Sequence, residues 1–233
     1  MHKNYPNSNP ERLRSFGRRK THGLSDIQEE QLALTLDQIG VPQNIDLTSW
    51  IDDKKQSYHG IGLEIGFGDG EHFVARAKEF PDIFWIGCEP FINGIVKVAD
   101  PYQSGEIPNI ALHADDARMI LDHLPDQCLS RAAILYPDPW HKNKHHKRRI
   151  VNPYLIKTLN RICMPNAMVQ IASDIPNYIN WTLDHFKKEV GFKLISDTPE
   201  KRQEAFSTWP GTKYEKKAIR EGRTPQYLTY IKI

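Results

Sequence analysis

The sequence predicts an α/β fold: a seven-stranded, mostly parallel sheet with helices on both faces, preceded by a basic arm and a helix. From residue 61 onward, short apolar segments of strand length alternate with segments of helical spacing, which is typical of parallel strands joined by helices. The first of these strands runs into a glycine-rich loop and then a helix. The 233 residues suffice for one well-buried core.

The N-terminal part of the chain is expected to lie outside this core. Residues 1–24 are polar, basic and rich in Pro, Gly and Asn, which predicts a flexible basic arm. Residues 25–39 begin with a capping-box pattern and carry apolar residues at helical spacing, which predicts a short amphipathic helix. Residues 41–58 are expected to form an irregular connection. The remaining residues, 59–233, are expected to form the main domain.

Seven strands and five further helices follow from the hydrophobic pattern of that domain. The first helix is ended by Pro81, because proline removes a backbone donor and clashes with the preceding turn. The strands are expected at residues 61–65, 83–88, 110–113, 132–135, 168–172, 192–195 and 227–233. The helices are expected at residues 71–80, 91–98, 117–123, 151–162 and 178–190.

Composition excludes several classes of protein. No stretch reaches the roughly 18 apolar residues of a membrane span, and the N-terminus lacks the apolar core of a signal peptide, so we expect a soluble, cytoplasmic protein. Cys88, Cys128 and Cys163 are far apart and form no CxxC pair. This spacing predicts reduced core thiols, and it argues against a disulfide framework or a zinc site.

The basic residues are clustered, although the formal net charge is only +2. Three short segments, residues 12–20, 142–149 and 213–223, together hold 15 of the 31 Lys and Arg residues. One such segment alone indicates a solvated surface. Three segments that converge on one face predict binding to a phosphate backbone.

Three glycines, Gly66, Gly68 and Gly70, follow the first predicted strand. Glycine lets the backbone turn sharply and approach a ligand closely, and the helix beyond presents unpaired N–H groups. The GxGxG spacing differs from the GxGxxG of NAD-binding folds, and the GK[ST] of a phosphate-binding P-loop is absent. The loop therefore predicts a ligand site of another kind, since tight strand-to-helix turns also use glycine.

Acidic residues stand at the ends of the first three predicted strands. Glu64 precedes the glycines, where it would attract a positively charged ligand group; Glu89 ends the second strand, where a carboxylate accepts hydrogen bonds from ribose. Asp115 and Asp116 follow the third strand, near the expected place of an adenine amine. Each acid alone is more often a helix cap or a surface charge. Together, at one edge of a parallel sheet, they predict a site for S-adenosylmethionine.

The fourth predicted strand is followed by Asp138, which lies between two prolines and ahead of Trp140. Such a carboxylate can accept backbone hydrogen bonds within its own turn, or it can face a ligand at the strand end. Trp140 either stacks on a base or wedges the loop against the core. His141, His145 and His146 lack an acid or cysteine at helpful spacing, so we expect no metal site.

Several motifs occur together, in order, across about two thirds of the chain: LEIGFGDGEHF, the Glu89 strand end, the Asp116-Ala117 pair, YPDPWHKNKHHKRRIV, ASDIPNY and GTKYE. Together they resemble the bacterial tRNA (guanine-N7)-methyltransferases, the TrmB family of class I methyltransferases. The PDPWHK…HHKRR segment is the most specific of them. The resemblance implies a Rossmann-like class I methyltransferase fold, S-adenosylmethionine as cofactor, and methylation of the variable-loop guanosine, position 46, of tRNA.

The resemblance also implies roles for individual residues. The cofactor contacts fall on Glu64, Glu89 and Asp116, beside the three loop glycines, and the key aspartate near cofactor and guanine falls on Asp138. Departures from the family pattern are Pro90, the extra Asp115 and the Ile175-Pro176 pair. The implied tRNA-substrate contacts are Lys142, Asp174, Thr212, Lys213, Tyr214 and Glu215.

The resemblance sets the expected partner as tRNA, with the protein acting as a monomer or homodimer. Residues 143–149 are expected to form a mobile cationic strip that grips tRNA phosphates. Two alternatives stay open: an enzyme of the same fold that acts on another RNA position or a small molecule, and a non-catalytic tRNA-binding subunit.

Overall fold

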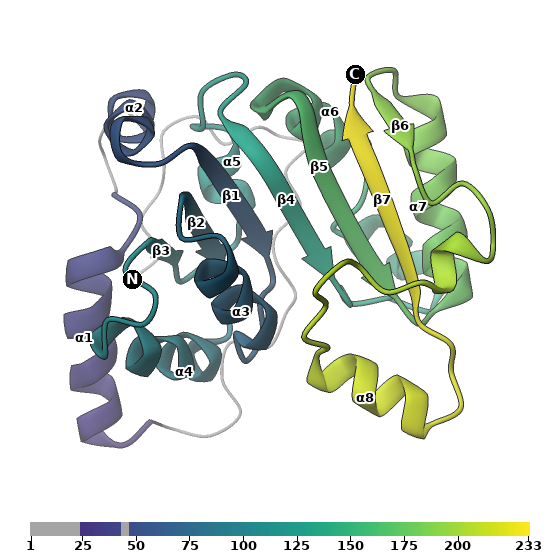
Figure 1. The fold of residues 1–233 in the computed structure, drawn as a ribbon. Helices are drawn as coiled ribbons and strands as arrows, with labels where there is room; N and C mark the ends of the chain where they lie inside the picture. Colours follow the sequence, from purple (N-terminus) through teal and green to yellow (C-terminus); the bar gives the residue numbers. More distant parts are fainter. Residues whose placement is uncertain (1–23, 43–46) are drawn as a thin grey trace.

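A computed structural model describes residues 24–42 and 47–233, and its centre is one seven-stranded sheet (Figure 1). The strand order is β3-β2-β1-β4-β5-β7-β6. Only β7 runs against the others, since β5 and β6 both pair with it antiparallel while the remaining pairs are parallel. The strands are β1 (Gly60–Ile65), β2 (Ile83–Cys88), β3 (Ile110–His113), β4 (Leu129–Leu135), β5 (Cys163–Ser173), β6 (Phe192–Leu194) and β7 (Gln226–Lys232).

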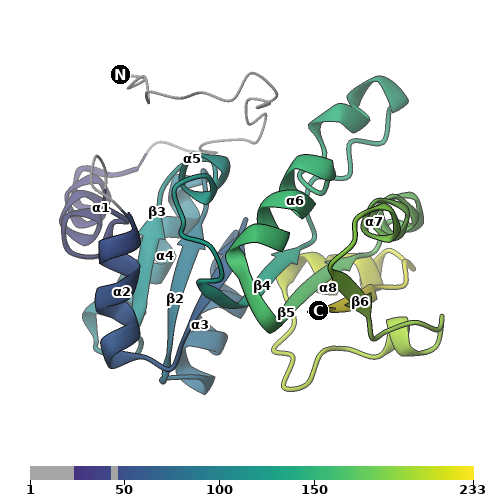
Figure 2. The same ribbon diagram turned by 90° about the horizontal axis from the view of Figure 1, so that it is seen from above.

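Helices cover both faces of this sheet (Figure 2). One core layer packs α2, α5, α6 and α7 on the sheet, and a second packs α1, α3 and α4 on the opposite face. The helices are α1 (Asp26–Ile39), α2 (Leu47–Ser57), α3 (Glu71–Glu79), α4 (Ile92–Gln103), α5 (Arg118–Leu121), α6 (Pro153–Ile162), α7 (Pro176–Lys188) and α8 (Lys213–Arg220), with short 3₁₀ helices η1 (Asn143–Arg148) and η2 (Lys201–Gln203).

The sheet topology determines where a ligand can bind. The chain moves outward from β1 through β2 to β3, and then returns to place β4 on the other side of β1. The carboxyl ends of these four parallel strands therefore share one edge, and the strand order reverses between β1 and β4. In open α/β sheets this reversal leaves a crevice at the strand ends in which ligands bind.

The predicted α/β class, the seven strands and the helices on both faces are confirmed. β4 and β5 are longer than expected, because Leu129 pairs with Cys163 across a register shift. The Met-Pro-Asn sequence after Cys163 resembles a turn, and it hid the start of β5. The predicted basic arm at residues 1–24 lies, up to residue 23, outside the described residues.

The expectation of an irregular connection over residues 41–58 is wrong, because it contains helix α2. This helix is eleven residues long, and only Leu47 and Ile51 are fully buried in it. Trp50 adds an edge-to-face contact with Phe84 of β2, with ring centroids 5.7 Å apart. So few apolar positions give no clear periodic signal, and contact with the sheet stabilises the helix instead.

Helix α8 was not expected from the sequence. Its only buried apolar residue is Ala218, and its other residues looked like a basic surface segment. Thr212 caps the helix, because its hydroxyl accepts a 3.1 Å hydrogen bond from the backbone N–H of Glu215. The GTKYE motif is therefore the start of a helix.

Two further expectations concern the three cysteines and the length of the helices. Cys88, Cys128 and Cys163 are all buried and unpaired, as the sequence predicted. Across residues 24–42 and 47–233, no helix is long and apolar enough to cross a membrane.

Candidate active site

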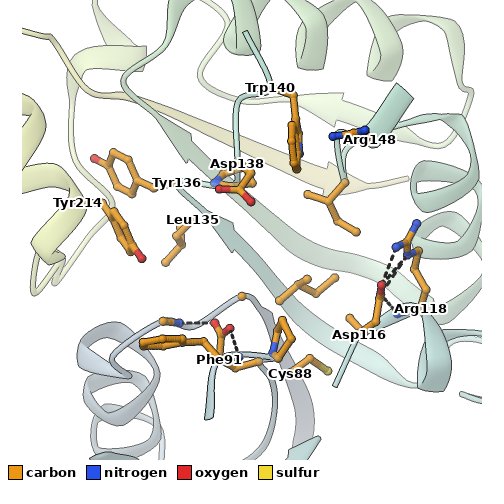
Figure 3. A pocket seen from close by; sticks show the side chains of 18 of the residues that line it. Cys88, Phe91, Asp116, Arg118, Leu135, Tyr136, Asp138, Trp140, Arg148 and Tyr214 are labelled. Carbon is orange, nitrogen blue, oxygen red and sulfur yellow. Dashed lines mark hydrogen bonds and ion pairs between the residues drawn. The ribbon is translucent and has the colours of Figure 1, made fainter. Parts of the chain in front are cut away.

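A cavity of about 710 Å³ opens at the carboxyl ends of β1, β2, β3 and β4 (Figure 3). This volume is typical of small-molecule and cofactor sites. The cavity collects residues that are far apart in the sequence, from the glycine-rich loop to the start of α8. Its walls include Ile65, Gly66, Gly68, Cys88, Glu89, Pro90, Phe91, Asp116, Ala117, Arg118, Leu135, Tyr136, Pro137, Asp138, Trp140, Arg148, Ile150, Lys213 and Tyr214.

The glycine-rich loop brings bare backbone to this cavity. Gly66 and Gly68 have φ of +76° and +59°, which L residues with side chains rarely adopt. A Cβ atom added to Gly66 would meet nothing within 4 Å, so the backbone there faces open space. Gly70 also has a positive φ, +83°, but it caps α3 and does not line the cavity.

Gly94 on α4 supports this loop, although it was not among the residues predicted from the sequence. A Cβ atom at Gly94 would lie 1.8 Å from the carbonyl oxygen of Gly68. No side chain fits in that space, so α4 and the glycine-rich loop are in direct backbone contact. A glycine inside a helical pattern is a weak signal of such a close approach.

Glu89 is buried at the end of β2 and connects two backbone segments. Its Oε2 accepts a 2.6 Å hydrogen bond from the N–H of Gly68, and its Oε1 accepts a 2.8 Å hydrogen bond from the N–H of Phe91. Burial raises the pKa of this carboxyl, although the two hydrogen bonds oppose that shift. Each carboxylate oxygen has a second lone pair, so Glu89 can hold the loop and still accept hydrogen bonds from a ligand.

Asp116 lies at another side of the cavity and is paired with Arg118. The Nε of Arg118 donates to both carboxylate oxygens, at 3.0 and 3.2 Å, and the Arg118 backbone N–H donates to Oδ1 at 3.0 Å. The negative charge of Asp116 is thus compensated within the protein. Beside it, Ala117 and Ile150 give the cavity an apolar wall.

Asp138 faces the cavity between Tyr214 on one side and Trp140 on the other, opposite Cys88 and Phe91 (Figure 3). The side chain is exposed, yet surrounding protein atoms exclude part of its water, and this desolvation raises the pKa of Asp138. Among the described residues Asp138 forms no ion pair, unlike Asp116. It is therefore a carboxylate whose charge is available to a ligand.

The loop that carries Asp138 is anchored by Arg149, which lies only 1% exposed. Its Nε donates to the Pro139 carbonyl at 2.9 Å and its Nη2 to Asn177 Oδ1 at 2.6 Å, while the guanidinium lies over the Trp181 ring. Arg149 does not belong to the predicted cationic strip, because burial removes it from any phosphate. The residues before it form the 3₁₀ helix η1, and the mobility expected of this strip stays a prediction.

Trp140 is held by the same segment. The guanidinium of Arg148 lies over its ring at 4.9 Å from the centroid, and His145 meets it edge-on at 5.8 Å. Trp140 also lines the cavity. The ring thus contacts η1 and also borders the cavity, and stacking of Trp140 on a base stays a prediction.

Glu64 is not brought to the cavity. It is 1% exposed, and its Oε2 lies 2.7 Å from Nδ1 of His72 on α3, whose ring packs against Trp209. Side chains alternate between the faces of a strand, so Glu64 points toward α3 while Ile65 reaches the cavity. Glu64 holds the start of α3 to the central strand.

Four predicted substrate residues also lie outside the cavity wall. Asp174 is paired with Nε of Arg223 at 2.5 Å. Glu215 is buried and accepts hydrogen bonds from Trp209 Nε1, at 2.7 Å, and from the Tyr227 hydroxyl. Thr212 caps α8, and Lys142 is exposed at the start of η1. Of the predicted tRNA contacts, Lys213 and Tyr214 do line the cavity.

The chain matches a family model described as "Putative methyltransferase" over residues 59–227. A tRNA (guanine-N(7)-)-methyltransferase of Ruegeria sp. (strain TM1040) is 39% identical over 211 residues, which cover 91% of this chain and 82% of that protein. Enzymes of the same name from Jannaschia sp. (strain CCS1) and Paracoccus denitrificans (strain Pd 1222) are each 38% identical, with 97% and 95% of this chain covered and 98% and 96% of theirs. The chain belongs to the tRNA (guanine-N7)-methyltransferase family. The resemblance seen in the sequence motifs is confirmed.

Solved structures agree with the fold of this family. The 16S rRNA methyltransferase KamB superposes with a TM-score of 0.57 at 15% identity, covering 83% of this chain and 97% of its own. The antibiotic-resistance methyltransferase Kmr superposes with a TM-score of 0.52 at 16% identity, covering 84% and 98%. The predicted class I methyltransferase fold is thereby confirmed.

The cofactor of this family is S-adenosylmethionine, and the cavity fits it. The apolar wall beside Asp116 suits an adenine ring, and the second lone pairs of the Glu89 carboxylate suit ribose hydroxyls. The open backbone at Gly66 leaves room for the amino-acid end. In the described part of the chain, no group of three or more His, Cys, Asp or Glu residues is placed to hold a metal ion.

Proposed function

We propose that this protein transfers a methyl group from S-adenosylmethionine to N7 of guanosine in tRNA, and that the target is the variable-loop guanosine at position 46. The observation that carries the proposal is Asp138. Its carboxylate lines the cofactor cavity, is exposed, and forms no ion pair among the described residues. In this proposal tRNA binds the site in the cytoplasm, and the protein acts as a monomer or homodimer.

Little acid–base chemistry is required of the protein. Guanine N7 carries an in-plane lone pair and no proton, so no side chain has to remove one. S-adenosylmethionine, when bound, supplies a methyl group on a positively charged sulfur. The contribution of the protein is alignment, which converts a bimolecular encounter into an effectively unimolecular step and is worth up to about 7–11 kcal/mol.

Asp138 supplies the electrostatic part. As N7 gains the methyl group, positive charge spreads over the purine, and its N1–H and 2-amino groups become stronger donors. A carboxylate that accepts these hydrogen bonds stabilises the transition state more than the ground state. Trp140 and Tyr214 stand on either side of Asp138 (Figure 3), so aromatic rings are placed to contact the base between them.

The rate of methyl transfer is expected to depend on the ionisation of Asp138. The carboxylate is the active form, and desolvation raises its pKa, so protonation and loss of rate should begin at a higher pH than for an ordinary aspartate, near 3.9. A pH profile of the single-turnover rate, with circular dichroism to verify folding at each pH, measures this. An acid limb at or below the ordinary value would contradict the assignment.

Two helices that contribute residues to the cavity, η1 and α8, also carry exposed cations that can bind the tRNA backbone. Lys142, Lys144 and Lys147 are exposed on and next to η1, and Lys216 and Lys217 are exposed on α8. Exposed lysines gain affinity for phosphates by releasing counterions from the nucleic acid. We therefore assign these two helices to backbone binding, and the cavity to the base.

Replacing Lys142 with alanine is expected to weaken tRNA binding and to flatten its salt dependence. Loss of one phosphate contact lowers the slope of log K against log salt by about 0.7–0.9. Filter binding at several salt concentrations measures the slope. Lys157→Ala serves as a control, because it removes one exposed charge from helix α6, outside the two helices assigned to backbone binding. An equal change in both variants would argue against a specific contact.

One experiment tests the function directly. Unmodified tRNA is incubated with protein and labelled S-adenosylmethionine, digested to nucleosides and oligonucleotides, and mapped by mass spectrometry. We expect 7-methylguanosine at position 46. A methyl group at another nucleotide would support the alternative of a different RNA position, and tRNA binding without methylation would support a non-catalytic subunit.

A further inference from the structure

Asp69 lies in the glycine-rich loop and connects it to two helices. Its Oδ2 is 2.8 Å from Nζ of Lys97 on α4 and 2.8 Å from Nζ of Lys213, the first residue of α8. The Asp69 side chain is 15% exposed, against 56% for Lys97 and 38% for Lys213. A single, mostly buried carboxylate thus joins the cofactor loop to a helix that starts far along the chain.

The start of α8 is held by a second carboxylate from the same region. The backbone N–H of Lys213 donates a 3.0 Å hydrogen bond to Glu71 Oε2, and Glu71 is the first residue of α3. The side chain and the backbone of Lys213 are therefore fixed by Asp69 in the glycine-rich loop and by Glu71 directly after it. This fixes the position of the next residue, Tyr214.

Tyr214 packs on the cofactor loop itself. Its ring carbon lies 3.4 Å from the position that a Cβ atom on Gly68 would take, and the residue lines the cavity. Gly68 in turn donates to Glu89. A shift at the start of α8 would therefore move a wall of the cavity and release one side of the loop.

The charges support the same interpretation. Burial tends to raise the pKa of Asp69, but hydrogen bonds from Lys213 and Lys97 outweigh it, and the pKa lies below its usual value. Asp69 is therefore ionised, and the charge of Lys213 is compensated inside the protein. Lys216 and Lys217, one turn along α8, are exposed, and they are better placed than Lys213 to meet a phosphate.

We propose that Asp69 is a positioning residue that holds Lys213, and through it Tyr214, against the glycine-rich loop, so that Lys213 completes the cofactor cavity and does not bind the tRNA backbone. This proposal rests on the proposed function only where tRNA is concerned. The cofactor part stands on the geometry of the loop and α8 alone.

A double-mutant cycle tests the cofactor part. The dissociation constant of S-adenosylmethionine is measured by calorimetry, without tRNA, for wild type, Asp69→Asn, Lys213→Met and the double variant. Each single variant should bind about fivefold more weakly or worse, and the double variant no more weakly than the weaker single variant, because both remove one interaction. Lys97→Met should stay within about twofold, since it leaves the Asp69–Lys213 pair intact.

Independent, additive losses in the cycle, or unchanged affinity in Lys213→Met, would overturn the proposal. Thermal unfolding without ligand accompanies each measurement, and Lys213→Met at its partly exposed site serves as the principal variant if Asp69→Asn unfolds. If a variant binds S-adenosylmethionine weakly only because it is partly unfolded, its midpoint of thermal unfolding will be lower as well.

Salt dependence of tRNA binding tests the other part. Lys213→Met should keep the wild-type slope, while Lys142→Ala lowers it by about 0.7–0.9. A lowered slope in Lys213→Met would return Lys213 to the tRNA backbone and overturn the proposal. If wild type binds no tRNA, the proposed function fails, yet the cofactor cycle still decides the role of Asp69.

Discussion

Replacing Asp138 with alanine is expected to lower kcat for tRNA methylation by about 10²- to 10³-fold, the usual effect of removing one preorganised electrostatic contact to the transition state. The carboxylate lines the cavity, is exposed, and forms no ion pair in the described part of the chain. It therefore has its charge available when positive charge develops on guanine. Single-turnover methylation of unmodified tRNA, with saturating cofactor, measures the effect.

Three comparisons separate this role from others. Affinity for S-adenosylmethionine should change little in Asp138→Ala, because the carboxylate acts on the base. Asp138→Asn should lose most of the activity, since it preserves shape but removes the charge. Asp126→Ala, which removes an exposed carboxylate paired with Arg161, should remain as active as wild type. Incorporation within about twofold of wild type in Asp138→Ala would exclude the proposed role.

The parallel sheet could be predicted because its strands carry their own signal. β1 and β2 are buried along their whole length. β2 reads as a continuous apolar run, and β1 carries Ile61, Leu63 and Ile65 at alternate positions. The helices α2 and α8 could not be predicted in the same way. Their buried residues are few. Helix α8 also depends on the Thr212 cap and on a hydrogen bond to Glu71, and Glu71 lies more than a hundred positions earlier in the sequence.

The site was predicted in part, because strand ends meet at one edge of the sheet. This rule correctly brought Glu89, Asp116 and Asp138 to one cavity. It did not place Glu64, since one position along a strand reverses the face to which a side chain points. The partner His72 lies only eight residues further on, but nothing in its spacing shows that the pair is buried.

The basic segments show a second limit of sequence reasoning. Arg148 and Arg149 are adjacent in one run of positive charge, yet Arg149 is buried beneath the Asp138 loop while Arg148 lies over Trp140. Lys213 likewise has its charge compensated by Asp69. Charge patterns locate a basic surface, but only the packing of distant segments decides which of its residues face solvent.

Replacing Gly94 with alanine is expected to weaken S-adenosylmethionine binding by at least about tenfold and to lower the free energy of unfolding by about 1–3 kcal/mol, the usual cost of overpacking. The added Cβ would lie 1.8 Å from the Gly68 carbonyl oxygen. Because that atom belongs to the backbone, either α4 or the glycine-rich loop must move. The hydrogen bond from Gly68 to Glu89 would be disturbed with it.

The direction of the change in the free energy of unfolding distinguishes a close backbone contact from an ordinary helix position. In the middle of an ordinary helix, replacement of glycine by alanine stabilises a protein by about 0.4–1 kcal/mol, because it restricts the unfolded chain. A net loss of stability at Gly94 therefore measures the close approach of α4 to the loop. Calorimetry of cofactor binding and chemical denaturation give the two quantities separately.

Gly105→Ala provides the matched control. Gly105 has φ of +77°, and a Cβ atom there would meet nothing within 4 Å. Alanine at Gly105 should cost about 1–2 kcal/mol of stability from backbone strain alone, with cofactor affinity unchanged. If both variants lose stability but only Gly94→Ala loses affinity, the contact between α4 and the glycine-rich loop shapes the cofactor site. Equal affinities would mean that the loop holds its form without α4.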